Sequence, residues 1–266
     1  MVTTMTDKEF IKKLKLALNS PTKYVSPSSQ WGSFIDGKFI FDCCLLIKAI
    51  GWGWYADRDK VHGGAIYKSN NVPDYSCYNM IKDCTDISSN FSVISVGELV
   101  YMNDHVGIYI GDGKVIECTI AWNKRSVVES EISDKGIRTL NGKKPVNYQW
   151  KKHGKIKWIK YTNYYPIMNW QNACIKDGYT ALSADGEWGI YSERCARTMT
   201  VQKDTKNKNL CLFLQKVLTD KHLYSGSLDG VCGSYTVKAI KDYQTANKLY
   251  VDGVAGYYTW KHILGV

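Results

Sequence analysis

The sequence contains no long, uninterrupted hydrophobic run. Its most apolar stretch, residues 39–50, is interrupted by Asp42 and Lys48, whereas a transmembrane helix needs about 18 consecutive apolar residues. Residues 1–20 are rich in lysine and lack the continuous apolar core of a secretion signal. We therefore expect no membrane span and no export through such a signal.

Collagen-like and low-complexity repeats are also missing. Of the 266 residues, 44% are hydrophobic and 23% are charged, a composition typical of folded proteins rather than disordered ones. This length is sufficient for a large hydrophobic core, and two domains are the natural expectation.

The nine cysteines include no C-x-x-C motif, so we expect no structural zinc site. Because their number is odd, at least one thiol has no intramolecular partner. Without a secretion signal, the chain is expected to be made in a reducing cytoplasm with its thiols free. Most of them would then be small buried residues.

The charge is unbalanced towards the basic side, with 35 Lys and Arg against 25 Asp and Glu and a net charge of +10. Basic residues form only short pairs, so nucleic acid is not indicated as a partner. The excess suits an anionic membrane surface or a phosphate-bearing cell wall, or simply a soluble basic surface.

The first part of the chain combines helix and strand patterns. Thr6 and Glu9 have capping-box spacing, and the apolar residues after them predict a helix over residues 6–19. Asp42 is a suitable N-cap for a second helix that ends at Gly51. Runs of β-branched, aromatic or alternating residues predict strands at 98–102, 105–110, 114–119 and 155–161, with a hairpin turn at 111–113. Helices followed by antiparallel strands indicate an α+β domain.

An internal repeat follows Pro166. The pattern D-G-x-x-G-x-Y-S/T begins at Asp185, Asp229 and Asp252. The first two copies are 44 residues apart, and the same offset aligns Gln171 with Gln215. Asp-Gly favours a turn, the second glycine permits positive φ or close packing, and the serine or threonine is placed to cap the next helix. We expect a helical region whose turns mainly hold the helices together.

Cys43 and Cys44 occupy the first turn of the helix that Asp42 caps. Backbone N–H groups and the positive end of the helix dipole would lower the pKa of a thiol at this place. The same N–H groups could hold an oxyanion. A cysteine nucleophile also needs a base, and a third group that orients the base.

Of the five histidines, only His105 begins a predicted strand. If the turn to the next strand comprises residues 111–113, Gly107 faces Glu117, and His105 and Glu117 project from the same face of the hairpin. The Glu117 carboxylate could then accept the imidazole N–H and select its tautomer. A two-residue turn would place Glu117 on the opposite face. The remaining histidines, interpreted as structural or solvent-facing, are His62, His153, His222 and His262.

These residues resemble the motifs of the NlpC/P60 family of peptidoglycan cysteine endopeptidases. Residues 42–47 (DCCLLI) resemble the family's D-C-x-x-[LF]-[IV] helix start, and residues 97–100 (GELV) with 105–113 (HVGIYIGDG) resemble its second motif. The resemblance covers residues 24–161. It implies a papain-like fold in which N-terminal helices pack on an antiparallel sheet.

The resemblance also implies residue roles. Three catalytic residues are implied. Cys43 would be the nucleophile, His105 the base that takes its proton, and Glu117 the residue that orients His105. Residues expected to support the substrate or the oxyanion are Tyr24, Asp42 and Cys44. Tyr24 would line the cleft near the thiol, and the Cys44 side chain is expected in the core on the underside of the helix.

Residues 209–266 resemble the small three-helix peptidoglycan-binding module. The matching segments are the L-Q-x-x-L helix at 214–218, the turn at 229–236, Tyr243-Gln244 and Thr259-Trp260. Residues 167–208 resemble a half-copy of it. We therefore expect a cysteine peptidase domain at residues 1–163 and a helical wall-binding domain at residues 167–266.

This layout resembles a phage or prophage endolysin of a Gram-positive host. It implies a monomer that binds peptidoglycan and hydrolyses a stem-peptide amide, between D-glutamate and the diamino acid, without a metal or other cofactor. The alternatives are an N-acetylmuramoyl-L-alanine amidase with the same residues, as in the related CHAP domains, and a catalytically inert wall-binding phage component. We expect release through a holin-made lesion, with an otherwise exported autolysin as the alternative.

Overall fold

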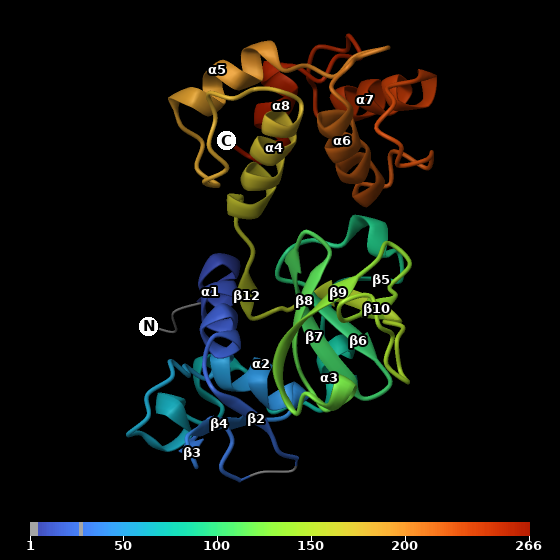
Figure 1. The fold of residues 1–266 in the computed structure, drawn as a ribbon. Coiled ribbons are helices and arrows are strands. Elements are labelled where there is room, and N and C mark those ends of the chain that lie inside the picture. Colours follow the sequence, from blue (N-terminus) through green and yellow to red (C-terminus); the bar gives the residue numbers. More distant parts are fainter. Residues whose placement is uncertain (1–4, 27–28) are drawn as a thin grey trace. The chain divides into compact units, whose positions relative to one another are not determined.

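The computed structural model describes residues 5–26 and 29–266 (Figure 1). These residues form two compact units, one ending at Thr162 and the other comprising Asn163–Val266. The first unit combines helices with antiparallel sheet, and the second is built from helices. The expected α+β fold followed by a helical region is therefore confirmed. No helix in the described part of the chain has the length and apolar character needed to cross a bilayer.

Three α-helices belong to the first unit. They are α1 (Asp7–Leu18), α2 (Cys43–Gly51) and α3 (Cys77–Lys82). The capping box of α1 is confirmed, because the Thr6 side chain accepts a hydrogen bond from the Glu9 N–H and the Glu9 carboxylate accepts one from the Thr6 N–H. Phe10, Leu14 and Ala17 of this helix are wholly buried, as its apolar spacing predicts.

The main sheet of the first unit has seven strands in the order β10-β9-β8-β7-β6-β11-β5, with antiparallel neighbours. The strands are β5 (Thr85–Ser88), β6 (Leu99–Met102), β7 (His105–Gly111), β8 (Lys114–Thr119), β9 (Ser126–Ile132), β10 (Arg138–Thr139) and β11 (Lys152–Lys155). Helix α2 packs against β7 and β8. The start of α2 therefore lies close to the strands that carry His105 and Glu117.

Two smaller sheets complete the first unit. One contains β2 (Thr22–Tyr24), β4 (Lys38–Phe41) and β3 (Phe34–Ile35), and the other pairs β1 (Met5–Thr6) with β12 (Ile159–Lys160). The expectation of one strand over residues 155–161 is wrong. The chain leaves the main sheet after Lys155 and turns, with the Ile159 N–H bonded to the Ile156 carbonyl, before it pairs with β1.

Five helices form the second unit. They are α4 (Tyr164–Lys176), α5 (Ile190–Thr198), α6 (Lys208–Asp220), α7 (Ser234–Ala246) and α8 (Tyr257–Leu264). Their shared core contains the buried aromatic residues Trp170, Tyr243 and Trp260.

The internal repeat corresponds to one hydrogen-bonded unit that occurs three times. In each copy the side-chain carbonyl of a buried glutamine accepts from the glycine N–H of the Asp-Gly pair. The glutamine amide donates to the aspartate, to a backbone carbonyl two residues further on, and to the repeat's serine or threonine. The glutamines are Gln171, Gln215 and Gln244.

The roles expected for two repeat positions need correction. In the second copy the first glycine, Gly230, has the positive φ, whereas Gly233 has extended backbone and is the N-cap of α7. Thr236 does not cap the helix. It lies in the first turn, where its hydroxyl receives a hydrogen bond from the Gln215 amide at 3.3 Å. A buried amide needs several acceptors at once, and this explains why a hydroxyl recurs at that position.

Replacement of Gln215 tests this unit. Gln215→Ala leaves the buried Gly230 N–H without its acceptor and removes one hydrogen bond each from Asp229 and Thr236, so we expect a loss of about 2–3 kcal/mol in the free energy of unfolding. Gln202→Ala is the matched control, because Gln202 is exposed, and it should change stability by less than about 0.5 kcal/mol. Urea unfolding of the full chain measures both, and equal effects would contradict the proposed role of the glutamine.

Candidate active site

Cys43 lies where a strand passes directly into a helix. Strand β4 ends at Phe41, and α2 begins at Cys43 after the N-cap Asp42. The Asp42 carboxylate accepts a hydrogen bond of 2.7 Å from the Leu45 N–H, as its position in the sequence predicts. This cap holds the first turn of α2 in place and fixes Cys43 at the N-terminal end of the helix.

His105 and Glu117 meet across the hairpin of β7 and β8. The His105 Nε2 atom is 2.6 Å from Glu117 Oε2. The turn differs from the expected one, because Gly111 pairs with Lys114 and leaves only two residues between them. A bulge between Tyr109 and Gly111 compensates by adding one residue to β7. Glu117 therefore keeps the register that a three-residue turn would have produced.

Gly107 lies two residues after His105 on β7, where a side chain would have little room. It lies opposite Glu117 in the register, and a Cβ atom at this position would be 2.6 Å from the Val115 side chain and 3.2 Å from the Glu117 Cβ. A side chain at position 107 would therefore crowd Val115 and the Glu117 Cβ.

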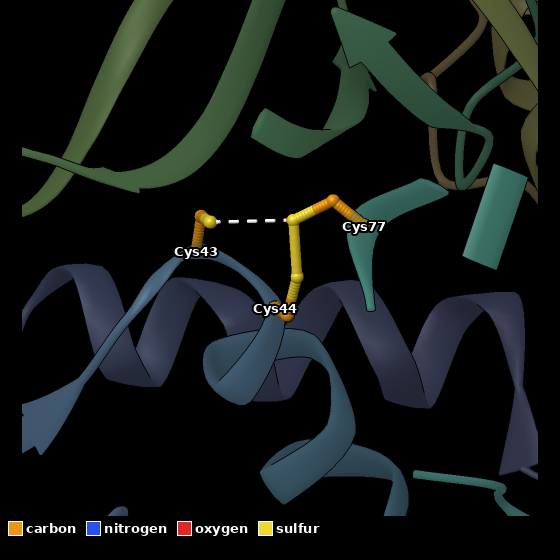
Figure 2. A group of neighbouring side chains, drawn as sticks. All are labelled: Cys43, Cys44 and Cys77. Carbon is orange, nitrogen blue, oxygen red and sulfur yellow. Dashed lines mark hydrogen bonds between the residues drawn. A yellow bond between two sulfur atoms is a disulfide. The ribbon is translucent and has the colours of Figure 1, made fainter. Parts of the chain in front are cut away.

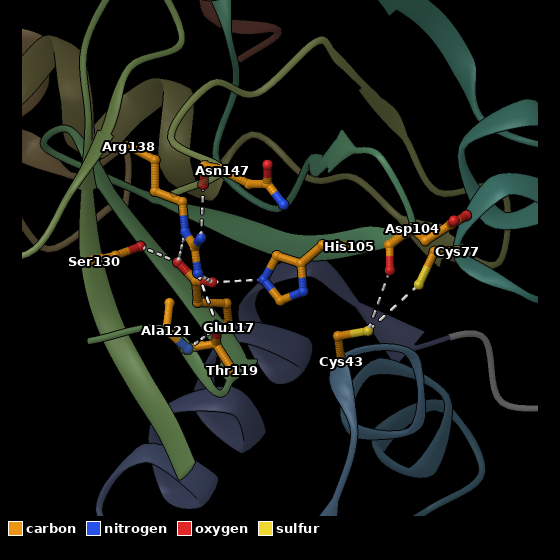
Figure 3. A network of polar contacts seen from close by, with 10 residues as sticks. All are labelled: Cys43, Cys77, Asp104, His105, Glu117, Thr119, Ala121, Ser130, Arg138 and Asn147. Atoms are coloured by element: carbon orange, nitrogen blue, oxygen red, sulfur yellow. Dashed lines mark hydrogen bonds and ion pairs between the residues drawn. The ribbon is translucent and has the colours of Figure 1, made fainter. Parts of the chain in front are cut away.

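Glu117 is completely buried and carries three charged or polar partners (Figure 3). Arg138 binds both carboxylate oxygens, with Nε 2.8 Å from Oε1. The Ser130 hydroxyl donates a hydrogen bond to Oε1, and His105 Nε2 lies within hydrogen-bonding distance of Oε2. A bidentate guanidinium contact is the strongest pairing available to a buried carboxylate. The partners of Glu117 therefore come from three other strands of the sheet, β7, β9 and β10.

These partners determine the pKa of Glu117. Burial alone would raise it, but the hydrogen bond and charge of His105, followed by those of Arg138, outweigh burial and lower the pKa. Glu117 thus stays ionised at neutral pH. The imidazole of His105 also stacks on Trp150, with 5.6 Å between ring centroids and 16° between planes. Its orientation is held by both contacts.

Two His–Glu pairs exist in the first unit, and only one leaves a nitrogen available. His153 places Nδ1 against Glu98 and Nε2 against the Asn90 carbonyl, 3.0 Å away, so both of its nitrogens are used. His105 contacts Glu117 through Nε2, and its Nδ1 lies on the side of the ring towards Cys43 (Figure 3). Of these two histidines, His105 is the one that keeps a ring nitrogen free of the Glu contact and of a backbone carbonyl, among the described residues.

The environment of the Cys43 thiol differs from the expectation. Burial, and then the negative charge of Asp42, raise the pKa of Cys43 to about 11. The backbone N–H groups of Cys44, Val106 and Cys43 act in the opposite direction but are outweighed. The expected lowering of the pKa by the helix start is therefore wrong for this state. Removal from water destabilises the thiolate more than the backbone N–H groups stabilise it.

Cys44 forms a disulfide with Cys77, the first residue of α3 (Figure 2). The expectation that all thiols are free is wrong for these two residues. It is met by the other seven, all of them buried: Cys43, Cys84, Cys118, Cys174, Cys195, Cys211 and Cys232. The Cys44 side chain is thus tied to a neighbouring helix, while its backbone N–H remains beside the Cys43 sulfur.

Tyr24 lies near enough to Cys43 and Asp42 to feel their charges. It ends β2 beside Phe41. Burial, and then the negative charges that Cys43 and Asp42 can carry, raise its pKa. Such an electrostatic effect requires these groups to be near one another.

Sequence reasoning missed four residues of this site. They are Cys77, Ser130, Arg138 and Trp150. Arg138 is 21 residues from Glu117 and has no motif around it, so only the pairing of β9 with β8 and β10 brings it to the carboxylate. A single sequence offers no signal for such a contact.

Among the described residues, one group of at least three His, Cys, Asp or Glu side chains has the spacing of metal ligands. It consists of Cys43, Cys44 and Cys77. Two of its sulfur atoms are joined in the disulfide, so in this state the group does not offer three thiolates.

Residues 209–263 match the family model described as "Putative peptidoglycan binding domain". This range lies within the segment for which the sequence suggested such a module. No curated protein matches the chain.

Solved structures similar to this chain include NlpC1 from Trichomonas vaginalis, at 15% identity and a TM-score of 0.34, with 56% of this chain and 44% of that chain covered. The peptidoglycan hydrolase RipB from Mycobacterium tuberculosis has 13% identity and a TM-score of 0.36, with 58% and 65% covered. A P60 domain from a Mycobacterium avium subspecies paratuberculosis antigen has 16% identity and a TM-score of 0.35, with 58% and 96% covered. The chain spans less than two thirds of the first two. All three TM-scores are below 0.5.

The lowered pKa of Glu117 predicts a pH dependence of stability. A carboxyl group whose pKa is lower in the folded state stabilises the fold above its unfolded pKa, and this contribution is lost as the pH falls through the folded value. We expect the wild type to lose more stability than Glu117→Gln between about pH 5 and pH 3. Urea unfolding at a series of pH values measures the difference.

At neutral pH, Glu117→Gln should itself cost about 3 kcal/mol, because Arg138 remains buried without its counter-charge. Glu129→Gln is the matched control. Glu129 lies on the neighbouring strand in a partly exposed pair with Lys114, and its replacement should cost less than about 1 kcal/mol. Parallel pH profiles for the wild type and Glu117→Gln would show that the fold does not lower the pKa of Glu117.

Proposed function

We propose that the chain is a peptidoglycan hydrolase whose first unit is a cysteine endopeptidase of the NlpC/P60 type and whose second unit binds the cell wall. The observation that carries the proposal is the arrangement of His105. Its Nε2 is held by a buried, ionised Glu117, and its Nδ1 lies towards a cysteine at a helix start (Figure 3). The proposed substrate bond is the stem-peptide amide between D-glutamate and the diamino acid.

His105 acts as the base in this mechanism. Because the Glu117 carboxylate accepts the Nε2–H, neutral His105 keeps its lone pair on Nδ1. Cys43 is a neutral thiol in the resting state, since its pKa is about 11. Its proton therefore moves to Nδ1 as the sulfur attacks the carbonyl carbon. The resulting imidazolium is stabilised by the Glu117 charge and then protonates the leaving amine.

The oxyanion is held by the start of α2. The backbone N–H groups of Cys43, Cys44 and Val106 all lie close enough to the Cys43 sulfur to affect its pKa. N–H groups of this kind stabilise the negative oxygen of a tetrahedral intermediate. Water then hydrolyses the thioester formed on Cys43, and His105 again takes the proton.

Wall binding is assigned to the second unit because residues 209–263 match a peptidoglycan-binding family. The net charge of +10 adds an attraction to anionic wall phosphates that salt weakens. Combined with the proposed peptidase, this organisation supports an endolysin. We propose a phage origin, synthesis in the host cytoplasm and passage to the wall through a holin-made lesion.

Replacement of the nucleophile is the direct test. Cys43→Ala should lower hydrolysis of purified Gram-positive cell walls by at least about 1,000-fold, because no other group forms the thioester. Cosedimentation with the walls should be unchanged. Cys84→Ala is the matched control, since Cys84 is a buried free cysteine outside the site. Full lysis by Cys43→Ala would refute the thiol mechanism, and absence of lysis by the wild type would favour an inert wall-binding protein.

Mass spectrometry of the released fragments identifies the bond. New amino groups on the diamino acid support the endopeptidase. A free D-lactyl group on muramic acid would instead show the amidase, which uses the same residues.

The two His–Glu pairs provide a second test. His105→Gln should lower hydrolysis by at least about 100-fold, because the proton of Cys43 loses its acceptor. His153→Gln removes the histidine of the second, buried pair and should reduce stability, while the folded fraction keeps its rate of hydrolysis. Circular dichroism gives the folded fraction, and wall turbidity gives the rate. Equal losses of rate in both variants would indicate that His105 acts only in folding.

A further inference from the structure

Three sulfur atoms lie together at the start of α2 (Figure 2). Cys44 and Cys77 form the disulfide, the Cys43 sulfur is 3.4 Å from the Cys77 sulfur, and all three atoms lie within 4.8 Å of one another. We propose that Cys77 exchanges its disulfide partner between Cys44 and Cys43, so that the proposed nucleophile is reversibly blocked from within the chain. The functional consequence rests on the proposed role of Cys43.

The exchange is balanced without an external oxidant. The Cys43 thiolate attacks the Cys77 sulfur, a new Cys43–Cys77 bond forms, and the Cys44–Cys77 bond breaks. The electron pair of the broken bond leaves on Cys44, which takes up the proton that Cys43 released. One disulfide is present before and after the step, and the number of free thiols does not change.

The chain connectivity favours neither partner. Cys77 is separated by 33 residues from Cys44 and by 34 residues from Cys43. Loop-closure entropy depends on the logarithm of this length, so it is nearly equal for the two disulfides. Their relative populations therefore depend on local contacts at the helix start rather than on the constraint placed on the loop.

The local geometry calls for a movement of the Cys43 side chain before the exchange. Cys43 and Cys44 are neighbours in the first turn of α2, and Cys77 begins α3. Attack must come along the axis of the existing disulfide, whereas the three sulfur atoms form a compact triangle. Rotation of the Cys43 side chain about its Cα–Cβ bond therefore precedes the exchange. This rotation breaks only a long contact, because the Cys43 sulfur is 3.8 Å from the Asp104 carbonyl, its other close partner.

The site then has two states. With Cys77 bound to Cys44, the Cys43 thiol is free to react, and with Cys77 bound to Cys43, the nucleophile is consumed. A reductant converts both disulfide forms into the same protein, in which all three cysteines are free thiols. Hydrolysis by the unreduced wild type is therefore expected to be lower than hydrolysis by the reduced protein.

Differential labelling of the full-length wild type tests the exchange without measuring activity. Free thiols of the unreduced protein are blocked with N-ethylmaleimide in denaturant at acidic pH, and the remaining cysteines are reduced and labelled with iodoacetamide. Tandem mass spectrometry that cleaves between residues 43 and 44 reads the label at each position. We expect the maleimide label on Cys43 in some molecules and on Cys44 in others, with Cys77 always carrying the second label.

Two matched variants test the consequence. In Cys44→Ser, oxidised glutathione should join Cys43 to Cys77 and lower hydrolysis at least 10-fold, and dithiothreitol should restore it. In Cys77→Ser, hydrolysis should be the same before and after reduction once samples are freed of glutathione adducts. Intact mass separates these adducts, which are heavier than the protein, from an internal disulfide, which is two hydrogen atoms lighter.

Two results would overturn the exchange. One is maleimide on Cys43 in every molecule of the wild type. The other is a Cys44→Ser protein that keeps both Cys43 and Cys77 free in oxidised glutathione. If the labels show exchange but reduced wild type and Cys77→Ser both fail to hydrolyse walls, the exchange stands and the proposed function fails.

Discussion

The charge of Glu117 is the constraint on which the candidate site depends. An ionised carboxylate without any exposure to solvent is tolerated only when its oxygens are paired. Here Arg138, Ser130 and His105 supply the partners, and they come from β10, β9 and β7. Compensating this one charge therefore holds several strands in register. It also leaves His105 with a fixed orientation and a fixed tautomer.

Cys43 shows two opposing effects at one atom. The start of α2 offers backbone N–H groups that favour a thiolate, whereas burial and the nearby Asp42 carboxylate favour the thiol. Burial prevails in the resting protein, so the sulfur is protected from ionisation until a base is engaged. The same crowding places the sulfur against the Cys44–Cys77 disulfide. The packing that buries Cys43 is thus the same packing that places it next to the disulfide.

The second unit depends on buried hydrogen bonds of neutral side chains rather than on a buried charge. Its three turns are connected to its helices by buried glutamines, each of which satisfies one backbone donor and several acceptors. Such units have strict requirements for residue type, because an amide deprived of one partner is costly inside a core. This explains why the repeat is visible in the sequence even though the third copy has a different spacing from its glutamine. Asp252 comes eight positions after Gln244, whereas Asp229 comes 14 positions after Gln215.

Local signals in the sequence were sufficient for several elements and for part of the site. The capping box of α1, the Asp42 cap of α2 and the strand that begins at His105 depend on neighbouring residues, and they could be predicted. The contact between His105 and Glu117 depends on the hairpin register and was predicted through the wrong turn, because a bulge restored the register.

What only the tertiary structure decided involves residues that are distant in sequence. Arg138 reaches Glu117 through two strand pairings, and Cys77 reaches Cys44 by the packing of α3 near α2. The pKa of Cys43 belongs to this class too, since the helix start is written in the sequence but the loss of water around the sulfur is not. Local hydrogen bonds follow from residue order, whereas burial and long-range pairing exist only once the whole unit has folded.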